Sequence, residues 1–338
     1  MKILTLILNL LYDVCDLIFI LPIIEVSMYA VGVMKTDFFK TIKILDGGMG
    51  QELLARGLIS KGTLWSASAL INEENHGLIV DTHRSFIDAG ADVIVTNNFS
   101  ARKVRLEQNK VENTFEYINK KAGELAVKAR DISKKNVLIA GGLPPQNGTY
   151  VPDDRDKTII EKNFKEQSEL INPYIDFFYL DVFSSSWEVE IALDIIEKFN
   201  KPVLVGLHFK KNGKLPTGEN ISEVIKKYKK HNWLGIIAAC VSLEIIEEHI
   251  DKLQSFDLPF GLKANLWKEQ EPLPVHKFNH SKPDEIGKNP NEIMGSRKEV
   301  TGEIFYDFSK RLKDKGATIF GGCCETNSSH ITALSKLK

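Results

Sequence analysis

Two cysteines stand side by side near the end of the chain, in the segment IFGGCCETNSSH at residues 319–330. Neighbouring residues rarely form a disulfide, because that bond needs well-separated Cα atoms with Cβ vectors turned toward each other. Burial of two small side chains at the end of a strand is a second interpretation, since cysteine is often buried. A third is a metal site, in which Cys323 and Cys324 bind one Zn²⁺ together with a ligand from elsewhere. The metal hypothesis requires another cysteine at the end of another strand.

The elements that would position these thiols alternate along the chain from residue 42 onward. Short β-rich runs, several of them continuously apolar, are separated by helical patterns such as those at 113–132 and 186–199. Continuous apolar runs are typical of parallel strands buried on both faces. The eight strands are expected at 42–48, 92–98, 136–142, 176–183, 202–209, 234–241, 259–266 and 317–324. Eight such repeats predict an α/β fold, a (β/α)8 TIM barrel. A doubly wound open sheet is the alternative, although no GxGxxG follows the first strand.

In a barrel of this kind, functional groups gather at the carboxyl ends of the strands. Cys240 ends the sixth predicted strand, while Cys323 and Cys324 end the eighth. Strands two apart around a barrel point their side chains into the same layer, so three thiolates can converge at the mouth. Asp181 and His208 belong to the fourth and fifth strand ends, and for His208 a polar core position is as plausible as catalysis.

Composition limits the class of protein. The 338 residues carry a net charge of −1, and 43% of them are hydrophobic. These values are those of an ordinary globular protein and offer no electrostatic basis for binding nucleic acid. Four cysteines in a chain of this length do not form a secreted disulfide framework, so we expect a cytoplasmic protein. The composition is also compatible with a homo-oligomer.

The first 34 residues differ from the rest. They are strongly apolar, but Asp13, Asp16 and Glu25 break the run of about 18 apolar residues that a membrane-spanning helix needs, so a membrane anchor is the weaker interpretation. A signal peptide is a second interpretation, although no clear cleavage site follows. We interpret residues 1–34 as an N-terminal extension, either a loosely attached appendage or residues upstream of a start at Met34, and residues 35–338 as the barrel domain.

Several motifs give the chain a resemblance to the homocysteine S-methyltransferase family, which includes the betaine–homocysteine methyltransferases. The resemblance covers roughly residues 42–338. It rests on ILDGGMGQELLARG at 44–57, LWS at 64–66, DAGADVIVTNNFSA at 88–101, AACVSLE at 238–244 and GATIFGGCCETNSSHITAL at 316–334.

The resemblance implies zinc-dependent methyl transfer to homocysteine, which yields methionine. Cys240, Cys323 and Cys324 would hold the Zn²⁺, and its open position would bind and deprotonate the homocysteine thiol, so no separate catalytic base is expected. Asp46 matches a substrate-binding aspartate of the family, and Gly47 lets the backbone approach the ligand. Asp181 stands where the family usually has a glutamate, which shortens this contact by one methylene.

The methyl donor is less clearly indicated. Trp65 matches a family tryptophan near the donor, and Phe99 lies where relatives often have tyrosine. Such rings hold onium groups by cation–π attraction, so we expect a small donor such as betaine or S-methylmethionine, although both rings could equally be core residues.

Residues 267–300 form a long polar segment that could close over the mouth; His276 and His280 within it have a zinc-ligand spacing. The alternative function is a non-enzymatic barrel, acting as a binding or assembly module, whose metal is structural or lost.

Overall fold

The computed structural model describes residues 37–228, 232–274, 285–286 and 290–338. The predicted extension at 1–34, together with His276 and His280, lies outside the described residues. Of the helices in the described part, none combines the length and the apolar character that crossing a bilayer requires.

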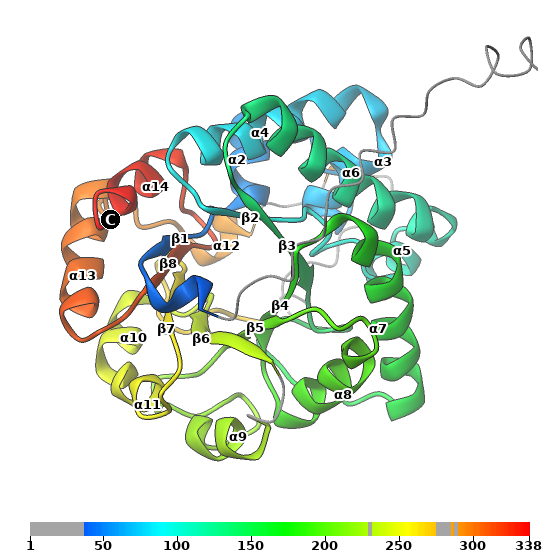
Figure 1. Cartoon of the computed structure of the whole chain (residues 1–338). Helices are drawn as coiled ribbons and strands as arrows, with labels where there is room; N and C mark the ends of the chain where they lie inside the picture. The colour runs from blue at the N-terminus through cyan, green and yellow to red at the C-terminus, as the bar shows by residue number, and fades with distance from the viewer. Residues whose placement is uncertain (1–36, 229–231, 275–284, 287–289) are drawn as a thin grey trace, which may run out of the picture. The chain divides into compact units, whose positions relative to one another are not determined.

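The core of the fold is a parallel sheet that closes on itself. Its strands run in the order β1-β8-β7-β6-β5-β4-β3-β2, with parallel pairing throughout. A parallel bridge between Leu45 and Val93 joins the two outer strands, and helices surround the ring (Figure 1). The strands are β1 Lys43–Ile44, β2 Val93–Val95, β3 Leu138–Leu143, β4 Phe177–Phe183, β5 Val203–Leu207, β6 Trp233–Ala239, β7 Phe260–Ala264 and β8 Ile319–Gly322. The predicted (β/α)8 barrel is confirmed, and the open doubly wound sheet is wrong.

Helices follow the strands in the order that the alternation predicts. The helix expected at 113–132 is α6, and the one expected at 186–199 is α8. The helices are α2 Met49–Ala55, α3 Ser68–Ile71, α4 His76–Asp88, α5 Lys103–Gln108, α6 Phe115–Ser133, α7 Lys157–Ile171, α8 Ser186–Glu197, α9 Ile221–Tyr228, α10 Leu243–His249, α11 Asp251–Gln254, α12 Asn291–Met294, α13 Gly302–Asp314 and α14 Ser328–Ser335. Each longer helix buries one apolar face; in α6 this face includes Ile118, Ala122, Leu125 and Ala129.

Side chains fill the inside of the barrel below its mouth. All seven residues of β4 are buried, as expected for a strand covered on both faces. Phe39, from the short helical turn Phe38–Lys40 before β1, is fully buried and meets Phe177 edge-on at 5.9 Å. Burying one large apolar side chain stabilises the fold by roughly 1.5–3 kcal/mol. The packed interior therefore gives the strand ends a rigid base.

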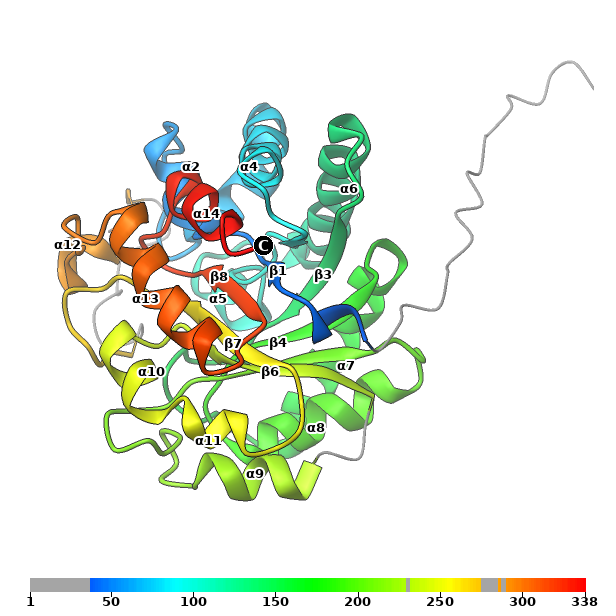
Figure 2. The same ribbon diagram turned by 60° about the vertical axis from the view of Figure 1, so that its left-hand side comes forward.

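A second apolar cluster supports one side of the mouth. It lies among α2, α4 and α6, which stand beside one another in Figure 2, and it includes Leu53, Ile79 and Ile118. The first strand is shorter than predicted. The strand itself ends at Ile44, backbone hydrogen bonds to the β8 segment continue as far as Asp46, and the chain then turns to begin α2 at Met49. The turn brings Asp46 and the glycines after it to the mouth.

Candidate active site

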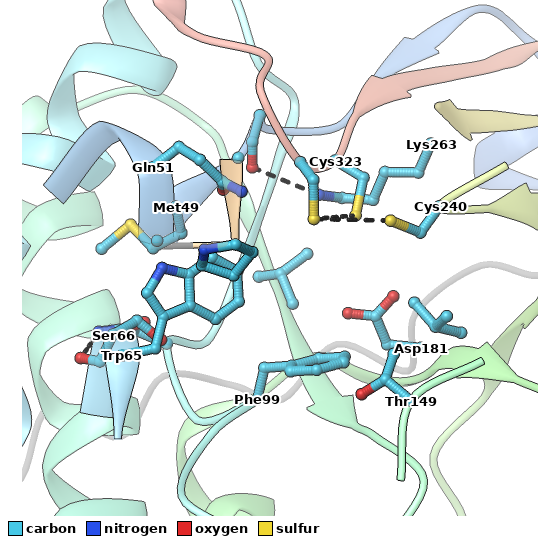
Figure 3. Close-up of a pocket in the computed structure, with 18 of the residues that line it drawn as sticks. Met49, Gln51, Trp65, Ser66, Phe99, Thr149, Asp181, Cys240, Lys263 and Cys323 are labelled. Atoms are coloured by element: carbon cyan, nitrogen blue, oxygen red, sulfur yellow. Dashed lines mark hydrogen bonds between the residues drawn. The ribbon is translucent and has the colours of Figure 1, made fainter. Parts of the chain in front are cut away.

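A pocket opens at the carboxyl ends of the strands. Its empty space is about 770 Å³, the open mouth included. Every residue predicted as a substrate or metal contact lines it: Asp46, Gly47, Trp65, Phe99, Asp181, Cys240, Cys323 and Cys324. Figure 3 shows the labelled cysteines on the same side of this pocket as Lys263, with Trp65 and Met49 across from them. The long segment after β7 contributes Trp267, Pro290 and Met294 to the lining.

Three thiols converge in the pocket, as the strand ends predict. The sulfurs of Cys240 and Cys324 are 3.6 Å apart, those of Cys323 and Cys324 are 3.9 Å apart, and all three lie within 4.8 Å of one another. Cys240 is buried directly after β6 and has φ +53°, a left-handed conformation that non-glycine residues seldom adopt. Strained backbone of this kind persists where the surrounding structure holds it, often at functional sites.

Asp46 is held in place by a buried cation. Its Oδ2 accepts a hydrogen bond from the Val95 N–H at 2.7 Å, and its Oδ1 lies 3.0 Å from the Lys263 ammonium. Burial by itself would lower the pKa of Lys263, but Asp46, Cys323 and Asp181 raise it well above its ordinary value. Lys263 therefore stays protonated. Its ammonium also donates to the Gly322 carbonyl at 2.7 Å, next to the cysteine pair.

Asp181 reaches the pocket from within β4 rather than from its end. The pairing of β4 with β5 shifts register between Leu180 and Phe183, and Val182 in this interval has φ +67°. Irregularities of this kind bend a strand and redirect its side chains. Burial, followed by the repulsion from Cys323 when its thiol is ionised, raises the pKa of Asp181 to about 7. An ionised Asp181 would thus be stabilised by any cation that enters the pocket.

The two glycines after Asp46 have a packing role that the sequence does not reveal. A Cβ on Gly48 would lie 2.5 Å from the carbonyl oxygen of Cys323, and one on Gly47 would lie 2.7 Å from the ring of Phe86. Thr326 ties the same two turns together, since its hydroxyl accepts from the Gly48 N–H at 3.1 Å and donates to the Cys323 carbonyl at 2.7 Å. Gly48 therefore lets the first turn lie directly against the cysteine turn, and Gly47 leaves room for the Phe86 ring of α4.

Several unpaired polar atoms face the pocket. Within the described residues, the side-chain amide of Gln51, the indole N–H of Trp65, the hydroxyl of Thr149 and Oδ1 of Asp181 are buried without hydrogen-bond partners. Buried polar groups normally find partners, so unpaired ones around a cavity indicate ligand contacts. Gln51 and Thr149 were not expected from the sequence, because a single polar residue in the first turn of a helix or in a loop has no distinguishing pattern.

His208 does not line the pocket. Its ring is buried, Nδ1 lies 3.4 Å from the Ala239 carbonyl, and the ring packs on Tyr150. Burial lowers the pKa of His208 to about 4, so the ring is neutral near pH 7. Of the two interpretations of this residue, the polar core position matches the structure.

The closed parallel barrel, the three clustered thiols and the pocket at its mouth together define a (β/α)8 barrel protein with a small-molecule site built around cysteines. A family model for homocysteine S-methyltransferases matches residues 43–337. The chain belongs to the homocysteine S-methyltransferase family, and it is an enzyme of methyl transfer to homocysteine.

Individual relatives agree with this assignment. The homocysteine S-methyltransferase 1 of Arabidopsis thaliana is 24% identical over 87% of this chain and 92% of its own. The betaine–homocysteine S-methyltransferase 1 of Bos taurus is 26% identical over 86% and 70%, and the S-methylmethionine–homocysteine S-methyltransferase of Pongo abelii is 24% identical over 87% and 78%. The metallated homocysteine methyltransferase MmuM from Escherichia coli shares the fold, with a TM-score of 0.69 at 20% identity over 88% of this chain and 96% of its own.

Proposed function

We propose that this enzyme uses Zn²⁺, bound by Cys240, Cys323 and Cys324, to transfer a methyl group from a small onium donor to homocysteine. The observation that supports the proposal most is the convergence of three sulfurs within 4.8 Å at the barrel mouth.

The donor set suits zinc in both chemistry and spacing. Thiolates bind Zn²⁺ at about 2.3 Å, and two of them in a tetrahedral site lie about 3.8 Å apart. Two of the three sulfur separations, 3.6 and 3.9 Å, are close to this value, and the third, between Cys240 and Cys323, is within 4.8 Å. Among the described residues, the group of possible metal ligands contains these three cysteines and no fourth histidine, cysteine or carboxylate. Three protein ligands are the arrangement typical of catalytic rather than structural zinc.

When bound, Zn²⁺ would supply Lewis acidity that lowers the pKa of the homocysteine thiol, so that a nucleophilic thiolate is available near neutral pH. The protein's own residues would orient the rest of the molecule. Asp181 lines the pocket, its Oδ1 has no hydrogen-bond partner in the described part of the chain, and it would accept from the homocysteine ammonium. Asp46, held by Lys263 and Val95, offers a second fixed carboxylate for the same group.

The donor would occupy the apolar side of the pocket. Trp65 lies across from Asp181 in Figure 3, and its indole packs over Gly50, where a Cβ would approach within 2.5 Å of the ring. Phe99 and Met294 extend this apolar lining. Aromatic faces attract sulfonium and quaternary ammonium groups. The names of two relatives specify betaine and S-methylmethionine, so either donor class is consistent with the family.

A donor panel with metal control tests the proposal. The purified full chain is stripped with a chelator, reloaded with zinc, and assayed for methionine formation from homocysteine with betaine, S-methylmethionine or dimethylsulfoniopropionate. We expect activity with one of these donors, its loss on stripping, and its return with zinc. Cys323→Ala should lose both metal and turnover, whereas Cys15→Ala, which changes the fourth cysteine, should lose neither. Stoichiometric zinc and full turnover in Cys323→Ala would refute the metal assignment.

A further inference from the structure

The sulfur of Cys240 has a polar neighbour that belongs to none of the predicted contacts. The Tyr150 hydroxyl lies 3.1 Å from Cys240 Sγ, and both side chains are buried. Tyr150 comes from the loop after β3, 90 positions before Cys240 in the chain. Its backbone has φ +68°, the same uncommon left-handed region that Cys240 occupies. Two strained residues from distant loops thus meet through one hydrogen bond.

The Trp267 side chain decides which group donates in the hydrogen bond between Tyr150 and Cys240. The indole Nε1 of Trp267 lies 3.5 Å from the Tyr150 oxygen. An indole N–H can only donate, so the Tyr150 oxygen is the acceptor in that contact. The single O–H of Tyr150 then remains for Cys240, whose sulfur as a thiolate can only accept. The order of donation is therefore Trp267 to Tyr150 to Cys240.

The backbone of Cys240 is held by the same stretch of chain. Asn265 Nδ2 donates to the Cys240 carbonyl at 2.5 Å, and Asn265 Oδ1 accepts from the Trp267 N–H at 3.2 Å. The Cys240 N–H donates to the Lys263 carbonyl at 2.8 Å. All these groups are buried, so water does not compete for them. Residues 263–267 therefore hold the cysteine and also the tyrosine that contacts its sulfur.

We infer that Tyr150 is a positioning residue of the metal centre: its O–H donates to the Cys240 thiolate, with Trp267 fixing its direction. The inference rests on the proposed metal site. A donated hydrogen bond draws electron density from the thiolate and holds the sulfur at one place on the pocket wall. Partners of this kind orient metal ligands and tune them, and their loss typically weakens metal affinity or activity by about 10–100-fold.

Cobalt substitution of the full-length enzyme tests the inference without using activity. Co²⁺ bound by thiolates has a sulfur-to-metal charge-transfer absorption whose energy depends on the electron density at sulfur. Tyr150→Phe keeps the ring and removes the O–H, so we expect the band to move to longer wavelength. Zinc should also pass to a chromogenic chelator about tenfold faster or more. Trp267→Phe, which removes the indole N–H, should shift the band in the same direction by a smaller amount.

Tyr228→Phe is the matched control, because Tyr228 at the end of α9 donates its hydroxyl to Glu190 of α8 and not to a cysteine. It should leave the band and the release rate unchanged. A wild-type band with no shift in either Tyr150→Phe or Trp267→Phe would overturn the inference while leaving the metal site intact. Absence of any thiolate band in the wild-type protein would instead overturn the proposed metal site itself. Circular dichroism of each variant verifies that it is folded.

Discussion

The Lys263 ammonium lies 3.0 Å from Oδ1 of Asp46, and both side chains are almost completely buried, at 7% and 1% exposure. The two residues belong to β7 and to the turn after β1, and β8 lies between those strands. Two charges taken out of water at this depth persist only as a well-placed pair. The pair therefore links the predicted substrate aspartate to the turn that carries Cys323 and Cys324.

Breaking this pair from one side should destabilise the protein. Lys263→Met leaves Asp46 buried without its cation, and removing one partner of a buried pair typically costs about 3–5 kcal/mol. Urea unfolding of the metal-free protein measures the loss. In the double variant with Asp46→Asn, stability should largely return, because no uncompensated charge remains, while activity with homocysteine should stay low. A Lys263→Met protein that unfolds at the wild-type urea concentration would contradict the account.

Asp181 should act mainly on homocysteine binding. Asp181→Asn turns a charge-assisted contact into a neutral one, worth roughly 1.5–3 kcal/mol, so the homocysteine KM should rise about tenfold to a hundredfold. The maximal rate should change less, since the metal site is intact. Steady-state kinetics with homocysteine as the varied substrate measure both quantities. An unchanged KM in Asp181→Asn would count directly against a substrate contact.

Lengthening the Asp181 side chain by one methylene tests whether its contact with homocysteine is stretched. Asp181→Glu restores the side chain that the family usually has, so it should be tolerated or should lower the homocysteine KM. A homocysteine KM that rises strongly in the Asp181→Glu variant would indicate instead a pocket shaped for a different thiol acceptor. The register shift between Leu180 and Phe183 is the structural reason to test this position.

Trp65 should affect the donor and not the acceptor. Cation–π attraction of about 0.5–2 kcal/mol corresponds to a rise of roughly 2- to 30-fold in the donor KM for Trp65→Leu. The homocysteine KM should remain near its wild-type value. Trp187→Leu is the matched control, since Trp187 is a partly buried residue of α8 that does not line the pocket. Equal effects of Trp65→Leu on both substrates would indicate general damage to the pocket.

The barrel and the three thiols were predictable because both depend on simple patterns. Apolar runs alternate with helical stretches, and Cys240 falls two strands before Cys323 and Cys324, so barrel geometry alone brings the sulfurs together. Lys263 could have been noticed in the sequence, because it is a charged residue within the apolar strand run 259–266. Its partner Asp46 could not, because closure of the barrel and not sequence spacing brings the two residues together.

Other features of the site could not be predicted from the sequence. Tyr150 lies in a loop with no periodic pattern. Its hydroxyl reaches Cys240 from a left-handed backbone conformation that the residue type does not suggest. Asp181 was placed at a strand end, whereas a register shift presents it from within β4. Gly47 was assigned to ligand approach alone, and its contact with Phe86 shows that packing also requires glycine there.

His83 should make stability depend on pH. This residue of α4 is fully buried, neither ring nitrogen has a hydrogen-bond partner within the described residues, and burial lowers its pKa to about 4. Since the unfolded value is about 6.5, the stability is complete above pH 6.5 and is lost as the pH falls toward 4. By pH 5 the loss from this group is about 2 kcal/mol.

A neutral replacement isolates this contribution. His83→Leu cannot gain a proton, so its urea midpoint should fall less than that of the wild-type protein between pH 7 and pH 5. The comparison cancels the carboxylates, which titrate in both proteins. Parallel losses in the two proteins over this interval would show that His83 is not held neutral.

The central claim is that homocysteine sulfur binds zinc at the open position left by Cys240, Cys323 and Cys324. X-ray absorption spectroscopy at the zinc edge measures this directly in the full-length zinc-loaded enzyme. We expect three sulfur neighbours and one lighter atom around the zinc without substrate, and four sulfur neighbours at about 2.3 Å once homocysteine is added. A zinc environment that already has four protein ligands and does not change with homocysteine would contradict it, and would favour a structural metal.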